Sequence, residues 1–146
     1  MSNDNTLMTA ALDYVAKGFS IFPLKPGSKV PLTARGYKDA SNDPEQVRQW
    51  WTQWPDANIS LPTGKINGFF VVDIDGAYPE GWPPLPDTTV VKTRRGFHHY
   101  YHYPEGQDVP SANKLLKQAV DIKSDGGYIV APPSIHSEGG RYEFIV

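Results

Sequence analysis

The segment GFFVVDID, at residues 68–75, constrains the fold of this chain more than any other. β-Branched and aromatic residues dominate it, and both favour β-strands. Successive side chains of a strand point to opposite faces of the sheet. Asp73 and Asp75 therefore share one face with Val71, and the other face is apolar: Phe70, Val72 and Ile74. Moving a carboxylate out of water costs free energy. Some favourable interaction must therefore offset the cost of placing two of them at the end of a buried strand.

The segment AVDIKS, at residues 119–124, has the same alternation. Val120 and Ile122 take one face, which leaves Asp121 and Lys123 on the other. This segment therefore predicts a second strand with an apolar face and an ionisable face.

A third segment, FHHYYHY at residues 97–103, places His98 on one face and His99 on the opposite, more aromatic one. If the three segments are neighbours in one sheet, their ionisable side chains converge on a single face: Asp73, Asp75, His98, Asp121 and Lys123.

The N-terminal half predicts two helices, each followed by a strand. Thr6 can cap the first helix and Gly18 can end it. Asp43, Pro44 and Gln46 can start the second helix as N-cap, first-turn proline and capping-box partner. The expected elements are a helix over 6–18, a strand over 19–24, a polar connection over 25–42, a helix over 43–54 and a strand over 57–64.

The C-terminal half is dominated by predicted strands. Residues 76–87 contain too many prolines for a helix or a central strand and predict a loop. We expect a hairpin over 88–103, a second hairpin over 119–132 that turns at DGG, and a last strand over 141–145. Helices early and strands late, without regular βαβ alternation, indicate an α+β fold with a mixed or antiparallel sheet.

Composition narrows the possible functions. A length of 146 residues fits one domain, over residues 1–146. The absence of cysteine excludes disulfides and thiolate zinc sites. A net charge of −2 gives no general attraction for nucleic acid. No apolar run is long enough to span a membrane and no signal pattern opens the chain, so we expect a soluble, cytoplasmic protein.

The three acids indicate a metal site. Hard divalent cations prefer carboxylate oxygen. Residues two apart on a strand are about 6.5–7 Å apart at Cα, so Asp73 and Asp75 can lean onto two cations about 3.5–4 Å apart. We expect Asp73, Asp75 and Asp121 to hold two Mg²⁺ or Mn²⁺ ions. Without metal, the clustered carboxylates repel one another, which raises the pKa of at least one of them.

Two alternatives stay open from the residues alone. An Asp-x-Asp pair also holds Mn²⁺ in glycosyltransferases that use sugar nucleotides, although 146 residues is short for their α/β nucleotide domain. A non-catalytic module that binds single-stranded nucleic acid would use the 12% of aromatic residues. Clustered acids argue against that module, because they repel phosphates unless metals intervene.

The order of the motifs resembles one known family, the bifunctional primase-polymerase domain of the archaeo-eukaryotic primase superfamily. VVDID is similar to its hydrophobic-Asp-hydrophobic-acid motif, GFH to its small-x-His motif, and VDIK to its hydrophobic-Asp motif. The flanking stretches ALDYVAKGFSIFPLKPGSKVPL, DPEQVRQWWTQWPDANISLPTG and DGGYIVAPPSIH are also similar. The resemblance spans residues 7–145.

The resemblance implies a role for each motif residue. Asp73 and Asp75 form the first motif, His98 the second and Asp121 the third, and all four are the expected catalytic residues. The implied fold is a sheet-based catalytic core of the RNA-recognition type with an extra N-terminal α/β unit. The implied activity is template-directed polymerisation of nucleotides, including primer synthesis, by two-metal-ion nucleotidyl transfer.

The resemblance also suggests substrate contacts. His98 would bind the triphosphate of the incoming dNTP or NTP, and the other expected nucleotide contacts are Lys123, Lys29, Arg94, Asn58 and Ser134. Contacts to the DNA template and primer are expected from Lys92, Arg94 and Arg95. Arg95 stands where many relatives have a small residue, and Lys123 stands where arginine is common, so its contact lacks a bidentate fork.

Relatives often continue into a helical region and a helicase. We therefore expect this chain to be the N-terminal part of a longer replication protein, with a helicase domain or partner. A prokaryotic host, plasmid or phage fits such a protein.

Overall fold

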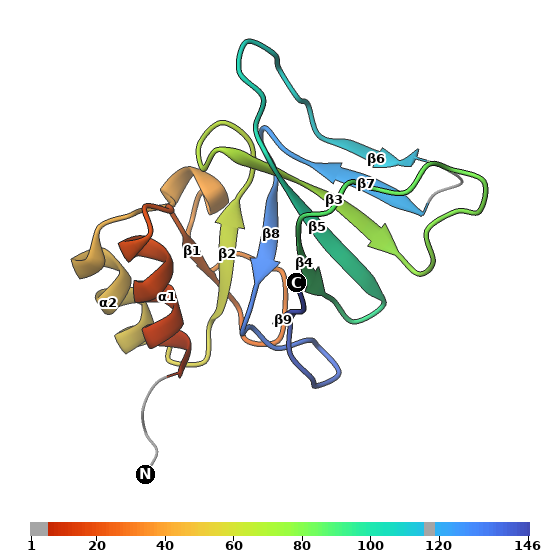
Figure 1. Cartoon of the computed structure of the whole chain (residues 1–146). Coiled ribbons are helices and arrows are strands. Elements are labelled where there is room, and N and C mark those ends of the chain that lie inside the picture. The colour runs from red at the N-terminus through yellow and green to blue at the C-terminus, as the bar shows by residue number, and fades with distance from the viewer. Residues whose placement is uncertain (1–5, 116–118) are drawn as a thin grey trace.

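Residues 6–115 and 119–146 are described by the computed structural model of the chain (Figure 1). Their elements, in chain order, are α1 (Thr6–Ala16), β1 (Phe22–Leu24), the 3₁₀ helix η1 (Gly36–Asp39), α2 (Pro44–Gln53), β2 (Asn58–Pro62), β3 (Phe69–Asp75), β4 (Thr89–Lys92), β5 (Gly96–His102), β6 (Ala112–Lys114), β7 (Val120–Lys123), β8 (Tyr128–Ala131) and β9 (Glu143–Phe144). The expectation of an α+β fold is confirmed. η1 and β6 were not predicted.

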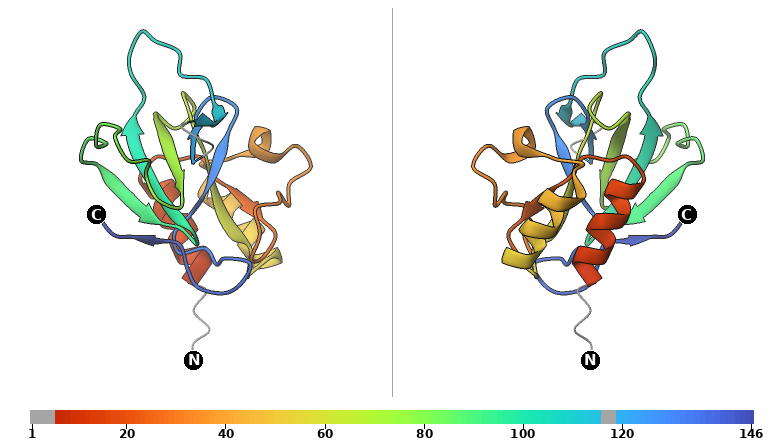
Figure 2. Two further views of the ribbon diagram at one scale, coloured as in Figure 1. Left: turned by 90° about the vertical axis from the view of Figure 1, so that its right-hand side faces the viewer. Right: turned by 90° about the vertical axis from the view of Figure 1, so that its left-hand side faces the viewer.

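Within the described residues the strands form two antiparallel sheets. The small sheet has the order β1-β2-β8, and the large sheet has the order β6-β7-β3-β5-β4-β9. The two helices lie on one side of the small sheet, and the large sheet lies on its other side (Figures 1 and 2). No helix among the described residues is long and apolar enough to cross a membrane.

The two helices begin and end close to where the sequence predicts. The chain leaves α1 at Gly18, which has φ +97°, and the N–H of Phe19 donates to the carbonyl of Tyr14. The Asp43 carboxylate caps α2 by accepting from the N–H of Glu45. The N–H of Asp43 donates to Ser41 Oγ at 3.0 Å, so Ser41 fills the position that the capping box assigned to Gln46.

The main hydrophobic core joins the helices to both sheets. Trp51 of α2, Phe22 of β1 and Ile59 of β2 are fully buried. The core also includes Val71 and Val91 from β3 and β4 of the large sheet. The small sheet and the near face of the large sheet are therefore held together as one packed unit.

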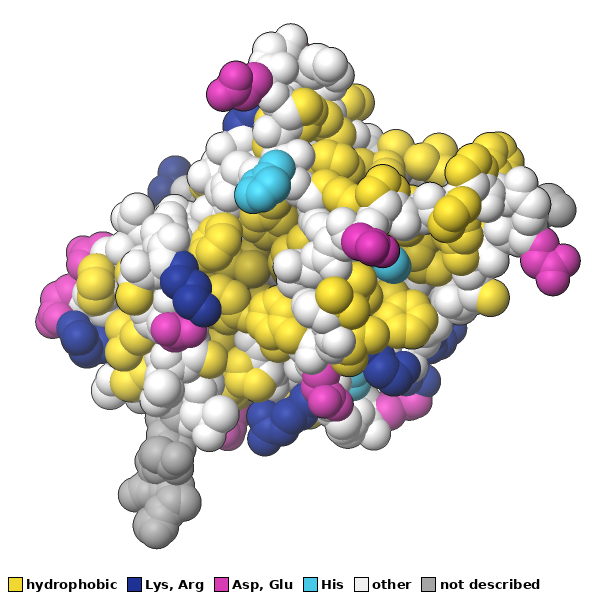
Figure 3. All heavy atoms as spheres, in the orientation of Figure 1, with side chains coloured by type: hydrophobic (Ala, Val, Ile, Leu, Met, Phe, Trp, Pro, Cys, Tyr) yellow, Lys and Arg dark blue, Asp and Glu magenta, His cyan; other side chains and the backbone are white. Residues whose placement is uncertain are grey.

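The large sheet has an inner face toward the small sheet and an outer face away from it. On the outer face, Tyr78 and Leu85 from the predicted loop pack against a small cluster of buried aliphatic side chains: Val72, Ile74 and Val120. The Tyr101 hydroxyl ties the same loop down by donating to the carbonyl of Pro86 at 2.8 Å. Figure 3 shows hydrophobic side chains gathered over this side of the molecule.

The predicted hairpin over residues 119–132 is wrong. β7 pairs with β3 in the large sheet, whereas β8 pairs with β2 in the small sheet. The chain does turn sharply, since the N–H of Gly127 donates to the carbonyl of Ser124. However, Thr63 binds both ends of this turn, donating from Oγ1 to Ser124 and from its N–H to the carbonyl of Gly127. The turn thus passes the chain from one sheet to the other.

The predicted hairpin over residues 88–103 is confirmed, because β4 pairs with β5. The last predicted strand is also present as β9, which pairs with β4 at the edge of the large sheet.

Candidate active site

One row of paired residues crosses the centre of the large sheet. Asp73 on β3 is paired with His98 on β5 at one side and with Asp121 on β7 at the other. Asp75 follows two residues later on the same face, opposite Gly96. The acids and the histidine that were expected to converge therefore do meet, because the register of β3 with both neighbours aligns their ionisable faces.

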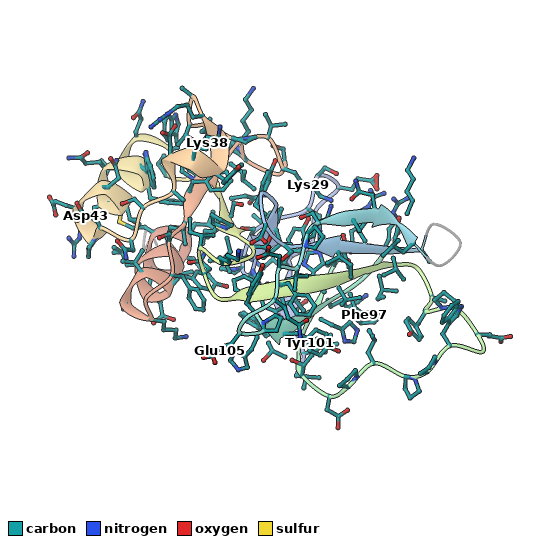
Figure 4. The ribbon with its side chains drawn as sticks, turned by 90° about the horizontal axis from the view of Figure 1, so that it is seen from above. Lys29, Lys38, Asp43, Phe97, Tyr101 and Glu105 are labelled. Carbon is teal, nitrogen blue, oxygen red and sulfur yellow. The ribbon has the colours of Figure 1, made fainter. Side chains whose placement is uncertain are left out.

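The inner face at this row forms the floor of a cleft of about 590 Å³. The opposite wall comes from the loop that bears Lys29 and from residues 135–137, and the turn that bears Arg94 and Arg95 also lines the cleft. A second compartment of about 340 Å³ shares Asp73, His98, Lys123, Lys29 and Tyr142 with the first and extends along residues 125–130. Figure 4 shows Lys29 on the side of the large sheet, whereas Lys38 and Asp43 lie over the helices.

Two of the three acids of the cleft contact a basic group or a hydrogen-bond donor. Asp75 forms an ion pair with Arg95 at 3.2 Å. Asp121 accepts from the N–H of Lys114 at 2.7 Å and lies 3.6 Å from Lys123 Nζ. Together these contacts compensate part of the negative charge of the cluster.

Burial raises the pKa of the Asp73 carboxyl. The nearby ammonium groups of Lys123 and Lys29 oppose this shift, and the charges of Asp121 and Asp75 add to it. The expectation that one clustered carboxyl has a raised pKa is confirmed, but desolvation is a larger cause than repulsion between the acids.

His98 is a neutral, buried imidazole. Burial, and then the positive charges of Lys29, Lys123 and His99, lower its pKa to about 3. Its Nε2 lies 3.6 Å from Asp73 Oδ1, which is too long for a hydrogen bond. Its Nδ1 is buried without a hydrogen-bond partner. The imidazole therefore lies beside the acids with ring nitrogens that make no hydrogen bond to them.

A second histidine, His136, lines the wall opposite the sheet and was missed by the sequence analysis. Tyr142 lies between the two histidines, with ring centroids 6.3 Å from His98 and 4.1 Å from His136. Burial lowers the pKa of His136, as do the nearby charges of Arg94 and Lys29. The signal available in the sequence was the histidine of PPSIH, just before a Gly-Gly turn.

The structure does not bring Asn58 and Ser134 to the cleft surface. Asn58 is 1% exposed and Ser134 is fully buried. The Ser134 hydroxyl accepts from the N–H of Ile59 at 2.7 Å, and the Asn58 amide binds backbone groups of Ser28 and Ile135. Their expected contact with nucleotide is not supported by this geometry.

The basic residues expected to contact the template are divided between two faces. Arg94 and Arg95 line the cleft, where Arg94 also forms an ion pair with Glu138. Lys92 lies on the outer face, with its Nζ 5.4 Å from the centre of the Phe97 ring. The structure thus separates Lys92 from the two arginines.

Within residues 6–115 and 119–146, no three acidic or histidine side chains are already close enough together to hold a metal ion. The donor set nevertheless fits Mg²⁺ or Mn²⁺. It offers three carboxylates on one face of adjacent strands, and carboxylate oxygen is the ligand these hard cations prefer. Asp73 and Asp121 are directly opposite each other on paired strands, an arrangement that places Cβ atoms about 4.5–5.5 Å apart.

An α+β fold with a cleft that combines clustered acids and lysines is consistent with an enzyme of the nucleotidyltransferase type. The comparison with protein families agrees with this class and is more specific. Residues 11–146 match the model of the Prim-Pol family, described as bifunctional DNA primase/polymerase, N-terminal, and the chain belongs to that family. No curated protein matches the sequence closely enough to count as a relative. Members of the family act on nucleotides and nucleic acid, and they are generally metal-dependent.

Proposed function

We propose that this domain catalyses template-directed nucleotidyl transfer, extending a DNA primer and synthesising primers from dNTPs or NTPs. The single observation that carries the proposal is the row Asp121–Asp73–His98 at the floor of a cleft bordered by lysines. Family membership supports the same activity.

Asp73, Asp75 and Asp121 would hold two Mg²⁺ or Mn²⁺ ions. When bound, such ions lower the pKa of an attacking 3′-hydroxyl and stabilise negative charge on a triphosphate and its leaving pyrophosphate. The carboxylates must be ionised for this task, and Lys123 and Lys29 favour the ionised form of Asp73.

The remaining residues of the cleft would bind and orient the nucleotide. Lys29 and Lys123 line the cleft with Asp73 and offer ammonium donors to phosphate oxygens. His98 is neutral at physiological pH, so it acts as a hydrogen-bond donor rather than as a cation. Arg94 and Arg95 line the cleft and can contact phosphates of the nucleotide or the primer-template.

The test is a double variant, Asp73→Ala with Asp75→Ala, assayed for Mn²⁺-dependent dNTP incorporation on a primed template. We expect incorporation to fall at least about 100-fold. A matched control is Asp108→Ala, which removes an exposed acid paired with Lys65 away from the cleft. Incorporation at the wild-type rate by a folded double variant would reject the proposal.

His98→Ala separates substrate binding from metal binding. We expect the apparent KM for dNTP to rise while Mn²⁺ binding in the absence of nucleotide is retained. An unchanged KM would transfer the role to another residue of the cleft, and His136 would be examined first.

The two alternatives have less support. The glycosyltransferase hypothesis expects an α/β nucleotide domain, and the strands here pair antiparallel. The single-strand-binding hypothesis does not account for three acids in one cleft. Incubation with sugar nucleotides, and DNA binding with and without divalent ions, would separate them from polymerisation. A helicase in the same protein stays a prediction of the family resemblance.

A further inference from the structure

The Asn58 side chain joins two loops that are far apart in the sequence. Its Nδ2 donates to the carbonyls of Ser28, at 3.2 Å, and Ile135, at 2.8 Å. Its Oδ1 accepts from the N–H of Ile135 at 2.9 Å. The amide therefore pairs with Ile135 as a neighbouring strand would, and it holds the carbonyl of Ser28 at the same time.

The two loops are those that form the wall of the cleft opposite the acids. Ser28 precedes Lys29, and Ile135 precedes His136, and all four line the cleft. The amide is 1% exposed, so its hydrogen bonds do not compete with water and fix the spacing of the two loops.

Two backbone bonds close the Lys29 loop near its tip: the N–H of Lys25 donates to the carbonyl of Val30 at 2.8 Å, and the N–H of Ser28 donates to the carbonyl of Lys25 at 3.1 Å. The Tyr128 hydroxyl donates to the carbonyl of Lys29 at 2.9 Å, and Ser28 Oγ accepts from the N–H of Val30 at 3.0 Å. Asn58 supplies the link between this loop and the rest of the wall. Lys29 is close enough to the acids for its charge to lower the pKa of Asp73, so its position matters for the charge balance of the cleft.

From these contacts we propose that Asn58 is a positioning residue, which holds Lys29 where it can bind the triphosphate of an incoming nucleotide. This inference rests on the proposed function. It explains why the chain places a buried amide at the start of the central strand of the small sheet, where a buried polar side chain must be hydrogen bonded. It also reassigns Asn58, which the sequence suggested as a direct contact.

The chain contains a matched control in Asn67. Its Oδ1 accepts from the N–H of Ser20 at 2.9 Å, and its Nδ2 donates to the carbonyls of Ser20 and Pro62, both at 2.9 Å. The pattern of three bonds is the same, but Asn67 does not line the cleft and joins no segment that does. Removal of this amide should therefore destabilise the protein without altering the position of Lys29.

The experiment measures binding of dATP with Mn²⁺, in the absence of template, by isothermal titration calorimetry. Four variants are compared with the wild type: Asn58→Ala, Asn67→Ala, Lys29→Ala and the double variant of Asn58 and Lys29. We expect Asn58→Ala to raise the Kd about fivefold and Lys29→Ala about tenfold. Asn67→Ala should keep the wild-type Kd although its Tm falls. The double variant should bind no more weakly than Lys29→Ala alone, because Asn58 acts through Lys29.

The outcomes are distinct. Equal Kd values for the wild type and folded Asn58→Ala overturn the inference and leave the proposed function standing. An equal rise in Kd in Asn67→Ala also overturns it, since that result assigns the effect to general destabilisation. Fully additive effects of Asn58 and Lys29 do the same. If the wild type itself does not bind dATP, the nucleotide site of the proposed function fails as well.

A second variant covers the case in which Asn58→Ala does not fold. Tyr128→Phe removes the bond to the carbonyl of Lys29 and leaves the ring that packs edge-on against Phe22 at 5.2 Å. If nucleotide binding depends on a fixed position of the Lys29 loop, this variant raises the Kd for dATP about twofold to threefold. The rise should disappear in the Lys29→Ala background. A wild-type Kd for Tyr128→Phe overturns the inference.

Discussion

Asp73 and His98 lie side by side on paired strands, with His98 Nε2 3.6 Å from Asp73 Oδ1. Burial shifts the two groups in opposite directions, raising the pKa of Asp73 and lowering that of His98. In both cases burial favours the uncharged form. The ionised acid therefore lacks a full counter-charge from its neighbour, which is the state that a bound cation would stabilise.

We predict that Asp73→Asn stabilises the metal-free domain while it abolishes Mn²⁺-dependent incorporation. At neutral pH the variant removes a desolvated negative charge that also faces Asp121 and Asp75, and we expect a gain of about 1 kcal/mol in the free energy of unfolding. The gain should vanish as the pH falls, because the raised pKa means that wild-type Asp73 takes up its proton early. Thermal unfolding in EDTA, between pH 4 and pH 8, measures both effects.

The control for this prediction is Asp108→Asn, which removes an exposed acid paired with Lys65. It should leave incorporation unchanged. A loss of stability in Asp73→Asn, at neutral pH and without metal, would show that the carboxylate supports the fold rather than the site.

A second prediction concerns acid stability. His98 has a pKa of about 3 in the fold, against an ordinary value of 6.5. Below pH 6.5 the unfolded chain binds a proton that the folded state does not bind, so the free energy of unfolding falls progressively as the pH falls from 6.5 toward about 3. His98→Gln should remove this component. Urea unfolding of both proteins at several pH values measures it, with His102→Gln as a control for loss of an exposed histidine on the same strand. Parallel pH profiles for the wild type and His98→Gln would contradict the assignment.

Much of the site could be predicted because it depends on strand parity. A residue's face is fixed by its position in the strand, so Asp73, His98 and Asp121 could be placed together without knowledge of the fold. Pairing partners depend on distant contacts instead. The DGG turn looks like a hairpin turn locally, but the bonds from Thr63 and the pairing of β8 with β2 place β8 in the small sheet.

The roles of buried polar residues could not be predicted for the same reason. Asn58 and Ser134 lie beside motifs that suggest nucleotide contacts, but what they bind is set by segments 30 to 77 residues away in the chain. The hydrogen-bond partners of a polar side chain within a strand cannot be read from its neighbours in sequence. His136 was missed because no alternation of polar and apolar residues surrounds it.

A third prediction concerns Arg95, which is paired with Asp75 at 3.2 Å. If Asp75 is a metal ligand, Arg95 competes with the cation for it. We expect Arg95→Ala to bind Mn²⁺ about twofold to threefold more tightly in the absence of nucleotide, a modest effect because the pair is exposed. Electron paramagnetic resonance of free Mn²⁺ measures the affinity. Arg35→Ala, which breaks an ion pair with Asp39 away from the cleft, is the control. Weaker Mn²⁺ binding in Arg95→Ala would instead mean that the arginine orients Asp75.

The last prediction explains the small residue two positions before His98. Gly96 is paired with Asp75, and a Cβ built on it would lie 1.8 Å from the carbonyl oxygen of Ile74. Gly96→Ala must therefore separate β3 from β5 at the acids, and we expect a loss of about 3 kcal/mol or more in the free energy of unfolding. Gly106→Ala is the control: with φ +73° and no atom within 4 Å of its Cβ, it bears only backbone strain of about 1–2 kcal/mol. Urea unfolding compares the two, and equal losses would refute the close approach of the strands. Any Gly96→Ala protein that still folds should incorporate dNTP poorly, because the displaced β5 carries His98 away from Asp73.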